Sequence, residues 1–301
     1  MPLVRMFDEG GCDQIASSRL EQLYEVKKAG ITKPTLLLRI PMLTEIENVA
    51  QLCDVTLISE IATMDALNAE CEKQGITPVS YTIGADFLNG SDGDIDREIA
   101  RLKEEVEVGA ALGVKLMRHD ATRGYEAENR GFKGFDDALP AIIRGCREVT
   151  EYAKTFGIRT MVENHGYFCQ ESTRVEKIVN GVQNDNFGLL VDIGNFMCAD
   201  ENPVEAVGRL APYAFHVQAK DFHKKSGNAP FFCDGFFKTR GGTYLRGAII
   251  GHGDVPVYQC LATLVENGYD GYVTVEFEGM EDQKTGTQYG LNTLKKIFAT
   301  L

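Results

Sequence analysis

Short apolar segments alternate with longer amphipathic ones along most of the chain, and this alternation limits the folds that it can adopt. Eight segments have the length of strands and are apolar throughout rather than at every second position, as in parallel strands buried on both faces. These are residues 34–40, 54–60, 76–83, 114–119, 158–164, 186–193, 213–220 and 271–278. Between them, helical patterns such as 94–113 and 137–157 end in glycine just before the next strand. The pattern predicts an α/β fold, a (β/α)8 TIM barrel with parallel strands.

The amino-terminal part of this barrel is expected to be irregular. Residues 12–17, followed by a helical pattern over 19–30, form a ninth candidate strand where eight are needed. No Pro/Ser-rich linker divides the chain. We therefore expect residues 1–301 to form a single TIM-barrel domain.

Composition excludes several classes of partner. The net charge of -13 disfavours nucleic acids and anionic membranes, since both are bound through Lys and Arg. The eight cysteines are scattered without a Cys-x-x-Cys pair, which indicates reduced thiols rather than disulfides or structural zinc. The first residues, MPLVRMFDEGG, do not resemble a signal peptide. These features predict a cytoplasmic protein with no nucleic-acid or membrane partner.

Polar side chains gather at the carboxyl ends of the last four predicted strands. Glu163 and His165 are two residues apart in the segment RTMVENHGYF, so on a strand they point the same way. Alone, such a pair is explained by a salt-bridged strand end. The next three strands, however, add Asp192 and Asn195, then His216, Gln218, Lys220 and Asp221, then Glu276 and Glu278. Because barrel active sites lie at this face, four successive polar strand ends predict one shared site.

A divalent metal would reconcile these side chains. Three converging carboxylates repel one another and become protonated unless a cation lies between them. Glu163, Asp192, Gln218 and Glu276 together offer only oxygen ligands, which favours Mn²⁺ or Mg²⁺. With His216 in place of Gln218, Zn²⁺ or Co²⁺ would fit better.

The ordered motifs VENHG, VDIGN, HVQAKD, GHGDV and TVEFEG resemble those of the xylose-isomerase-like TIM-barrel family of sugar isomerases and epimerases, over residues 76–301. The resemblance implies that Glu163, Asp192 and Glu276 hold the metal together with a histidine two residues before a Lys-Asp pair. That place holds Gln218 here, and His216 lies two residues earlier. Some dehydratases of this superfamily use glutamine as the ligand, so the site can survive the change while the exact reaction stays open.

The amino-terminal third resembles a different family. Its segments GGCDQIASSRLEQLYEVKKAGI and KPTLLLRI are similar to the barrel of PLP-dependent alanine and ornithine racemases. The strand that carries the Schiff-base lysine of those enzymes has no counterpart here, so no PLP is expected. Two resemblances in one chain indicate natural divergence or a chimera of barrel pieces, and a chimera would have an incomplete substrate pocket and low activity.

Two long connections are candidates for covering the site. Residues 220–254 are expected to form a loop without regular structure, a lid or binding loop. Arg240, Arg246 and His252 in it would bind the substrate or form a solvated basic rim. Residues 118–134 follow the fourth strand and place His119 and Arg123 at the same rim.

The resemblance implies an isomerase or epimerase that abstracts a proton next to the carbonyl of a small-molecule keto-sugar or sugar phosphate. Glu163 and Glu276 would act as paired acid and base, with His165 as a proton relay or base. The expected substrate-binding residues are His216, Lys220, Asn195, His119, Arg246 and His252. Family members also often form homo-oligomers.

Three other functions remain to be compared with this one. A lyase or dehydratase would expel a β-leaving group from the same enolate. An endonuclease of the superfamily needs a histidine-rich zinc cluster and a basic face, which 5 histidines and a charge of -13 argue against. A non-catalytic or chimeric barrel would keep the metal ligands and lack turnover.

Overall fold

The structure, a computed structural model, describes residues 15–301 apart from 18, 34, 38–42, 53–54, 57–65, 67–68, 127, 130, 229 and 231–232. It contains two compact units. The first takes residues 1–78 and 108–114, and the second takes residues 79–107 and 115–301. The prediction of a single domain over 1–301 stays a prediction.

The first unit has a parallel three-stranded sheet in the order β1-β2-β3. Its elements are β1 (Ile15–Ser17), α2 (Leu20–Lys28), β2 (Thr35–Leu37), η1 (Leu43–Glu45), α3 (Ile46–Leu52) and β3 (Val55–Thr56). Leu20, Leu23 and Val49 pack together between α2 and α3. The predicted strands 12–17, 34–40 and 54–60 are thus present in part, and their other residues lie outside the described ones.

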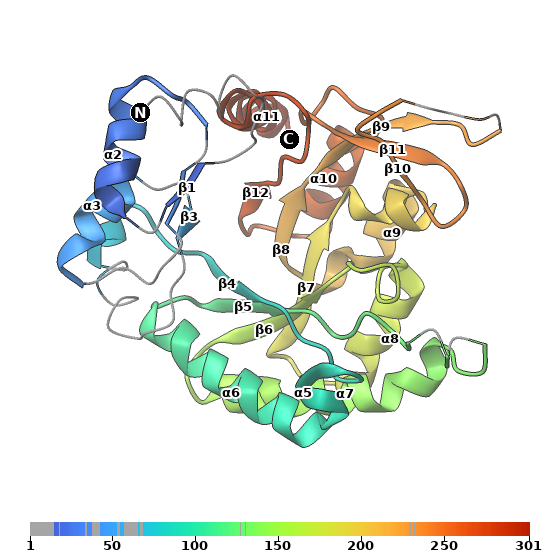
Figure 1. Ribbon diagram of the computed structural model, residues 1–301. Coiled ribbons are helices and arrows are strands. Elements are labelled where there is room, and N and C mark those ends of the chain that lie inside the picture. Colours follow the sequence, from blue (N-terminus) through green and yellow to red (C-terminus); the bar gives the residue numbers. More distant parts are fainter. Residues whose placement is uncertain are drawn as a thin grey trace. The chain divides into compact units, whose positions relative to one another are not determined.

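The second unit contains a parallel sheet of six strands, ordered β12-β8-β7-β6-β5-β4. Figure 1 shows that this sheet is curled like half of a barrel, with helices on its outer side. The strands are β4 (Ser80–Ile83), β5 (Leu116–His119), β6 (Arg159–Glu163), β7 (Phe187–Asp192), β8 (Ala214–Ala219) and β12 (Val273–Val275). Each lies within a segment predicted to be a strand. The TIM-barrel architecture expected from the sequence is therefore confirmed in this unit.

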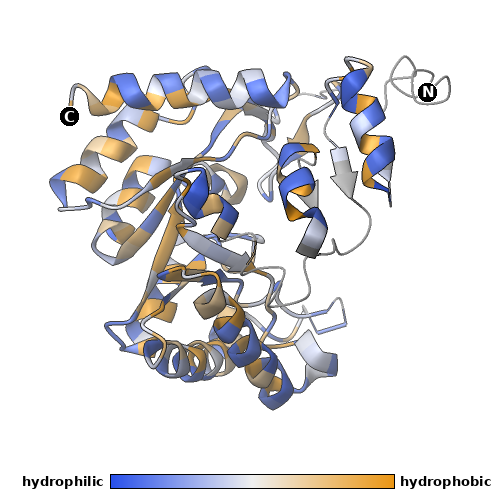
Figure 2. Ribbon diagram, turned by 90° about the vertical axis from the view of Figure 1, so that its left-hand side faces the viewer, coloured by the Kyte–Doolittle hydropathy of each residue, from blue (hydrophilic) through white to orange (hydrophobic). Residues whose placement is uncertain are grey.

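Amphipathic helices cover the outer face of the sheet. They are α6 (Ile95–Ala111), α7 (Phe135–Lys154), α8 (Ser172–Val182), α9 (Pro203–Leu210), α10 (Val257–Glu266) and α11 (Gln283–Phe298). Short turns connect the elements: α5 (Gly90–Gly93), which buries none of its residues, η2 (Asn195–Ala199) and η3 (Ala211–Tyr213). In α7, Ala138, Ile142 and Val149 recur at helical spacing and are fully buried. Figure 2 shows hydrophobic strands beneath helices that carry both hydrophobic and hydrophilic residues. No helix among the described residues is long and apolar enough to span a membrane.

A bulge between β7 and β8 decides which side chains face the inside of the curled sheet. Leu189 pairs with Ala214, but Leu190 pairs with His216, so Phe215 is skipped. As a result Asp192 pairs with Gln218. Directly paired residues share a face, and a shift of one residue would place the β8 polar side chains on the opposite face from Asp192.

The predicted loop over 220–254 contains a second, antiparallel sheet, so the expectation of an unstructured loop is wrong. Its strands are β9 (Asp221–Lys225), β10 (Phe237–Lys238) and β11 (Tyr244–Ala248), in the order β10-β11-β9. The turn between β10 and β11 is held to the loops after β6 and β7. Arg240 donates to Glu171 and to the Tyr167 carbonyl, and the Thr239 hydroxyl donates to Asp200 at 2.7 Å.

Candidate active site

Three carboxylates converge on the inner face of the second unit. Glu163 ends β6, Asp192 ends β7, and Glu276 directly follows β12. One oxygen of each lies within 4.8 Å of the others. The register explains why: Glu163 pairs with Leu190, Asp192 pairs with Gln218, and Gln218 pairs with Thr274, two residues before Glu276. All of them therefore point to the same face, as the sequence predicted for its metal ligands.

The unpaired oxygens in this cluster fit a cation. Among the residues that the structure describes, no N–H or hydroxyl group donates a hydrogen bond to Asp192 Oδ2, Glu276 Oε2 or Gln218 Oε1, and all three atoms are buried. Buried acceptors without a partner are rare in folded proteins. A shared proton, an ordered water or a cation would satisfy such oxygens, and a set made of oxygens alone suits a divalent metal such as Mn²⁺ or Mg²⁺.

Lys220 is the cation that the chain itself supplies to this cluster. Its Nζ lies 3.4 Å from Asp192, 3.2 Å from Glu276 and 3.4 Å from Glu278, and donates to Asn195 at 3.1 Å. The side chain is buried, and burial alone would lower the pKa of Lys220; the surrounding carboxylates outweigh burial and raise it. Lys220 therefore stays charged and offsets part of the repulsion between the acids.

The protonation of the carboxylates follows from burial and from their contacts. Burial raises the pKa of Asp192 well above its usual range, although Lys220 opposes it. Burial also acts on Glu276, but a hydrogen bond with Asp192 and the Lys220 charge lower its pKa overall. Burial raises the pKa of Glu163. Burial and the neighbouring carboxylates therefore favour a proton on Asp192, next to Glu276, more than on an exposed carboxyl group.

Gln218 fits the position of a fourth ligand better than His216. Gln218 lies level with Asp192 in the sheet, whereas His216 pairs with Leu190, two residues further from the strand end. His216 Nε2 is already in contact with the Thr274 hydroxyl at 3.1 Å, and burial lowers the pKa of the ring to about 4. His216 is therefore a neutral ring packed below the cluster.

A second polar group adjoins the carboxylates and was not predicted from the sequence. Arg118, near the end of β5, places its Nη2 atom 2.7 Å from Glu163 Oε2 and 2.8 Å from Asp120 Oδ1. Asp120 Oδ1 lies 3.1 Å from His165 Nδ1. Asn195 donates to the other Glu163 oxygen at 3.0 Å. Glu163 and His165 therefore belong to one network of ion pairs and hydrogen bonds.

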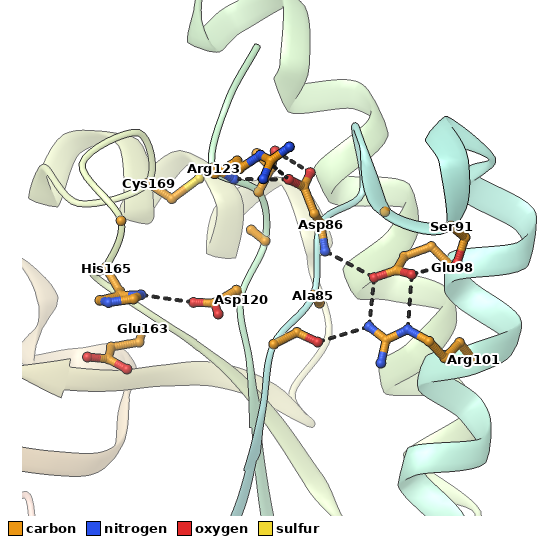
Figure 3. A pocket seen from close by; sticks show the side chains of 15 residues that line it. Ala85, Asp86, Ser91, Glu98, Arg101, Asp120, Arg123, Glu163, His165 and Cys169 are labelled. Carbon is orange, nitrogen blue, oxygen red and sulfur yellow. Dashed lines mark hydrogen bonds and ion pairs between the residues drawn. The ribbon is translucent and has the colours of Figure 1, made fainter. Parts of the chain in front are cut away.

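A cavity of about 490 Å³ opens beside this network, within the range of small-molecule sites. It is formed by residues after β4, β5 and β6 and by α6, and Glu163, Asp120 and His165 lie on one side of it (Figure 3). Arg123, expected at this rim, lines it, and Asp86 and Glu98 lie on the other side.

Three of the predicted substrate-binding residues are not brought to the cluster. His119 pairs with Val162, so it faces away from Glu163, and it packs edge-on against Phe87. Arg246 contacts Glu281 at 3.9 Å and the Phe236 ring. His252 is exposed on the turn after β11. The other three, His216, Lys220 and Asn195, do lie at or directly below the carboxylates.

The GHGDV motif acts through its backbone. The buried Asp221 carboxylate accepts hydrogen bonds from the amides of Gly251, Gly253 and Val255 at 2.8, 2.8 and 3.0 Å. A Cβ on Gly253 would meet Asp221 Oδ1 at 2.3 Å, which explains the glycine. Asp221 thus fixes the loop after β11 and takes no part in the carboxylate cluster.

Comparison with known proteins gives two kinds of sequence relative. The chain is 22% identical to an inosose dehydratase of Lacticaseibacillus casei over 172 residues, 55% of this chain and 56% of that protein. It is 39% identical to an ornithine racemase of Acetoanaerobium sticklandii over 66 residues, 22% of this chain and 18% of that protein. The chain therefore spans about half the length of the inosose dehydratases that it matches and a small part of the racemase.

Solved structures of similar fold include metal-bound ones. A xylose isomerase-like TIM barrel protein of Mycobacterium smegmatis in complex with magnesium has a TM-score of 0.62 at 16% identity, covering 93% of this chain and 88% of that one. The IOLI protein with a zinc atom has a TM-score of 0.62 at 17% identity, covering 95% and 98%. The 3-keto-D-glucoside 4-epimerase of E. coli has a TM-score of 0.61 at 14% identity, covering 87% and 98%. At these identities the likeness concerns the fold alone.

The family itself is established by sequence. The pattern of the xylose isomerase-like TIM barrel family matches residues 48–297, which begins before the motifs that suggested it and covers most of the chain. The chain therefore belongs to the xylose isomerase-like TIM barrel family.

Proposed function

We propose that the chain is a divalent-metal-dependent isomerase or epimerase that removes a proton next to the carbonyl of a small keto-sugar. The observation that carries this proposal is the cluster of Glu163, Asp192 and Glu276, whose oxygens meet within 4.8 Å beside a cavity. Together with Gln218 these residues would hold the cation, and their oxygen-only set favours Mn²⁺ or Mg²⁺ over Zn²⁺ or Co²⁺. When bound, the cation supplies positive charge that stabilises negative charge developing on the substrate oxygen.

The chain's own residues supply the proton transfers. Glu163 and Glu276 come from strands that are not neighbours, so they approach a substrate between them from different directions, as an acid and base pair must. Lys220 and Asn195, which already contact the carboxylates, would orient substrate hydroxyl groups. His165, half-exposed in the cavity wall, would relay the proton.

A dehydratase acting on a cyclic or linear polyhydroxy ketone is the second candidate. The pKa of His165 is raised, chiefly by its hydrogen bond with Asp120, so the ring holds a proton to higher pH. A protonated imidazole in the cavity wall could donate that proton to a departing hydroxyl group. The inosose dehydratase relatives support this alternative.

Solvent proton exchange tests both candidates. The Mn²⁺-loaded protein would be incubated in D₂O with ketohexoses, 3-keto-glucosides and an inosose, and the products followed by NMR. A deuterated epimer or isomer supports the first candidate, and an unsaturated product supports the second. Glu163→Gln and Glu276→Gln are expected to lose about 100-fold or more of the rate. Glu266→Gln, an exposed glutamate at the end of α10, is the matched control. Mn²⁺ binding without exchange on any substrate would instead indicate a non-catalytic barrel.

A further inference from the structure

Arg118 is a buried cation for which the reaction proposed above has no use. Its side chain is 6% exposed. Nη1 donates to the Ile83 carbonyl at 3.3 Å, whereas Nε has no hydrogen-bond partner among the described residues. Burying a guanidinium with one donor unsatisfied costs free energy. This cost must be offset by the other contacts of the guanidinium group.

Those contacts join two carboxylates of different elements. The single atom Nη2 lies 2.7 Å from Glu163 on β6 and 2.8 Å from Asp120 after β5. Arg118 pairs with Met161 in the sheet, so Arg118 and Glu163 point to the same face. One planar nitrogen between two carboxylates fixes how far apart they lie and which oxygen of each faces inward.

Asp120 in turn determines the orientation of His165. Its Oδ1 atom contacts both Arg118 Nη2 and His165 Nδ1, the latter at 3.1 Å. A carboxylate only accepts hydrogen bonds, so the neutral ring must carry its proton on Nδ1. The lone pair then lies on Nε2, the nitrogen not bonded to Asp120, on a ring that lines the cavity together with Glu163.

We propose that Arg118 is a positioning residue that holds Asp120 and Glu163 in a fixed relation, so that His165 keeps its Nδ1–H tautomer and leaves the lone pair on Nε2. The expected effect on turnover rests on the proposed function. The expected effect on the His165 tautomer rests only on the distances given above. Arg118 acts through Asp120 and Glu163, the two carboxylates that it contacts.

Ring-nitrogen NMR of His165 tests the expected effect on the tautomer. In ¹⁵N-labelled wild type the neutral ring should show its proton on Nδ1. Asp120→Ala removes the acceptor and should give a mixture of both tautomers, and Arg118→Met should shift the population in the same direction. Arg147→Met is the matched control, since Arg147 is half-buried on α7 and donates to the Gly181 and Val182 carbonyls. Wild-type His165 signals in Arg118→Met would overturn the inference.

If Arg118→Met does not fold, Arg118→Lys takes its place. A lysine keeps the charge, but its compact ammonium ends a flexible stem in place of a planar guanidinium, so it holds the two carboxylates less rigidly. A mixed tautomer population is again expected, and unchanged wild-type signals would again overturn the inference.

Turnover of whichever substrate exchanges its proton tests the expected effect on turnover. Arg118→Met and Asp120→Ala should lower kcat by about 10- to 100-fold, as loss of outer partners commonly does, with KM within about threefold. The double variant should be no slower than the slower single one, because the two residues act as a unit. Equal kcat in Arg118→Met and wild type, or fully additive losses, would contradict it. The NMR measurement needs neither metal nor substrate, so a failure of the proposed function is separable from a failure of this inference.

Discussion

On β5 the sequence predicted that His119 faces the site, but its neighbour Arg118 does so in the structure. The sequence shows that His119 ends the strand, but it does not show which face His119 takes, because that depends on register with β6. In the structure His119 pairs with Val162, and Arg118 takes the inner face instead. By contrast Glu163, Asp192 and Glu276 were predicted from strand ends, because polar residues at four successive strand ends indicate a shared site.

Lys220 provides a prediction at this scale. Lys220→Met should lower the free energy of unfolding by about 3–5 kcal/mol in chelator, because it leaves buried carboxylates unpaired. Mn²⁺ should restore most of this loss if a cation occupies the cluster. Urea unfolding with and without Mn²⁺ measures both effects. Lys154→Met, which breaks an exposed pair with Asp185, should cost less than about 1 kcal/mol in either condition. Equal losses of unfolding free energy in the two variants would argue against a role of Lys220 in pairing with the buried carboxylates.

Glu98 gives a prediction about acid stability. Burial alone would raise its pKa, but hydrogen bonds from Arg101, the Asp86 amide and Ser91 lower it from 4.5 to about 2. A folded pKa below the unfolded one means that Glu98 stabilises the fold fully above pH 4.5 and loses this contribution as the pH falls towards 2.

Glu98→Gln should therefore lower stability by about 2 kcal/mol at neutral pH and show a shallower loss in acid. The measurement is the free energy of urea unfolding over a pH series, compared with Glu104→Gln, an exposed neighbour on the same helix. Parallel pH profiles for wild type and Glu98→Gln would show that the pKa of Glu98 is not lowered by folding.

At the scale of elements, the sheet β9-β11-β10 is the part that the sequence concealed. In strands such as Asp221–Lys225 and Tyr244–Ala248, charged residues interrupt the apolar ones, so the apolar runs that marked the barrel strands are lacking. Their pairing depends on the β10–β11 turn and on Asp200, a non-glycine residue at φ 59° that is distant in sequence. No local pattern encodes such a contact.

The anchoring of this turn can be tested through Asp200. Asp200→Gly keeps the left-handed backbone and removes the bonds to Thr239 and Gly241, at 2.7 and 2.6 Å. Losing about 2 kcal/mol locally should speed amide exchange over residues 237–245 by roughly 30-fold, with β7 unchanged. Hydrogen exchange read by mass spectrometry measures it, with Asp270→Gly as an exposed control. Unchanged protection of the turn would show that the bonds contribute little.

At the scale of the whole chain, the family pattern extends from residue 48 to 297 and thus includes residues of both compact units. The sequence predicted this family from residues 76–301, where the motifs follow buried strands. The amino-terminal third was the harder part, and its resemblance to the racemases stays a prediction; the chain also matches an ornithine racemase over 66 residues. Whether the chain is a chimera stays a prediction.

A metal bound at the cluster should stabilise the whole chain. Mn²⁺ at 100 times its dissociation constant adds about 2.7 kcal/mol if it binds only the folded state. The melting temperature should therefore rise by several degrees over that in chelator. Glu163→Gln should abolish the rise, and Glu266→Gln should keep it. Identical melting of the wild type in chelator and in Mn²⁺ would mean that the carboxylates do not form a working metal site.

The skipped residue in β8 has a consequence for how this site can evolve or be redesigned. Side-chain substitutions near Phe215 leave the pairing of Asp192 with Gln218 in place, whereas removing this one residue would turn His216, Gln218 and Lys220 towards the helices. The tolerance of this strand to insertions and deletions should thus be far lower than its tolerance to replacements. A deep mutational scan that includes single-residue deletions would measure this difference. We expect deletions in β8 to be as damaging as the loss of a site residue, because they change which side chains face the site.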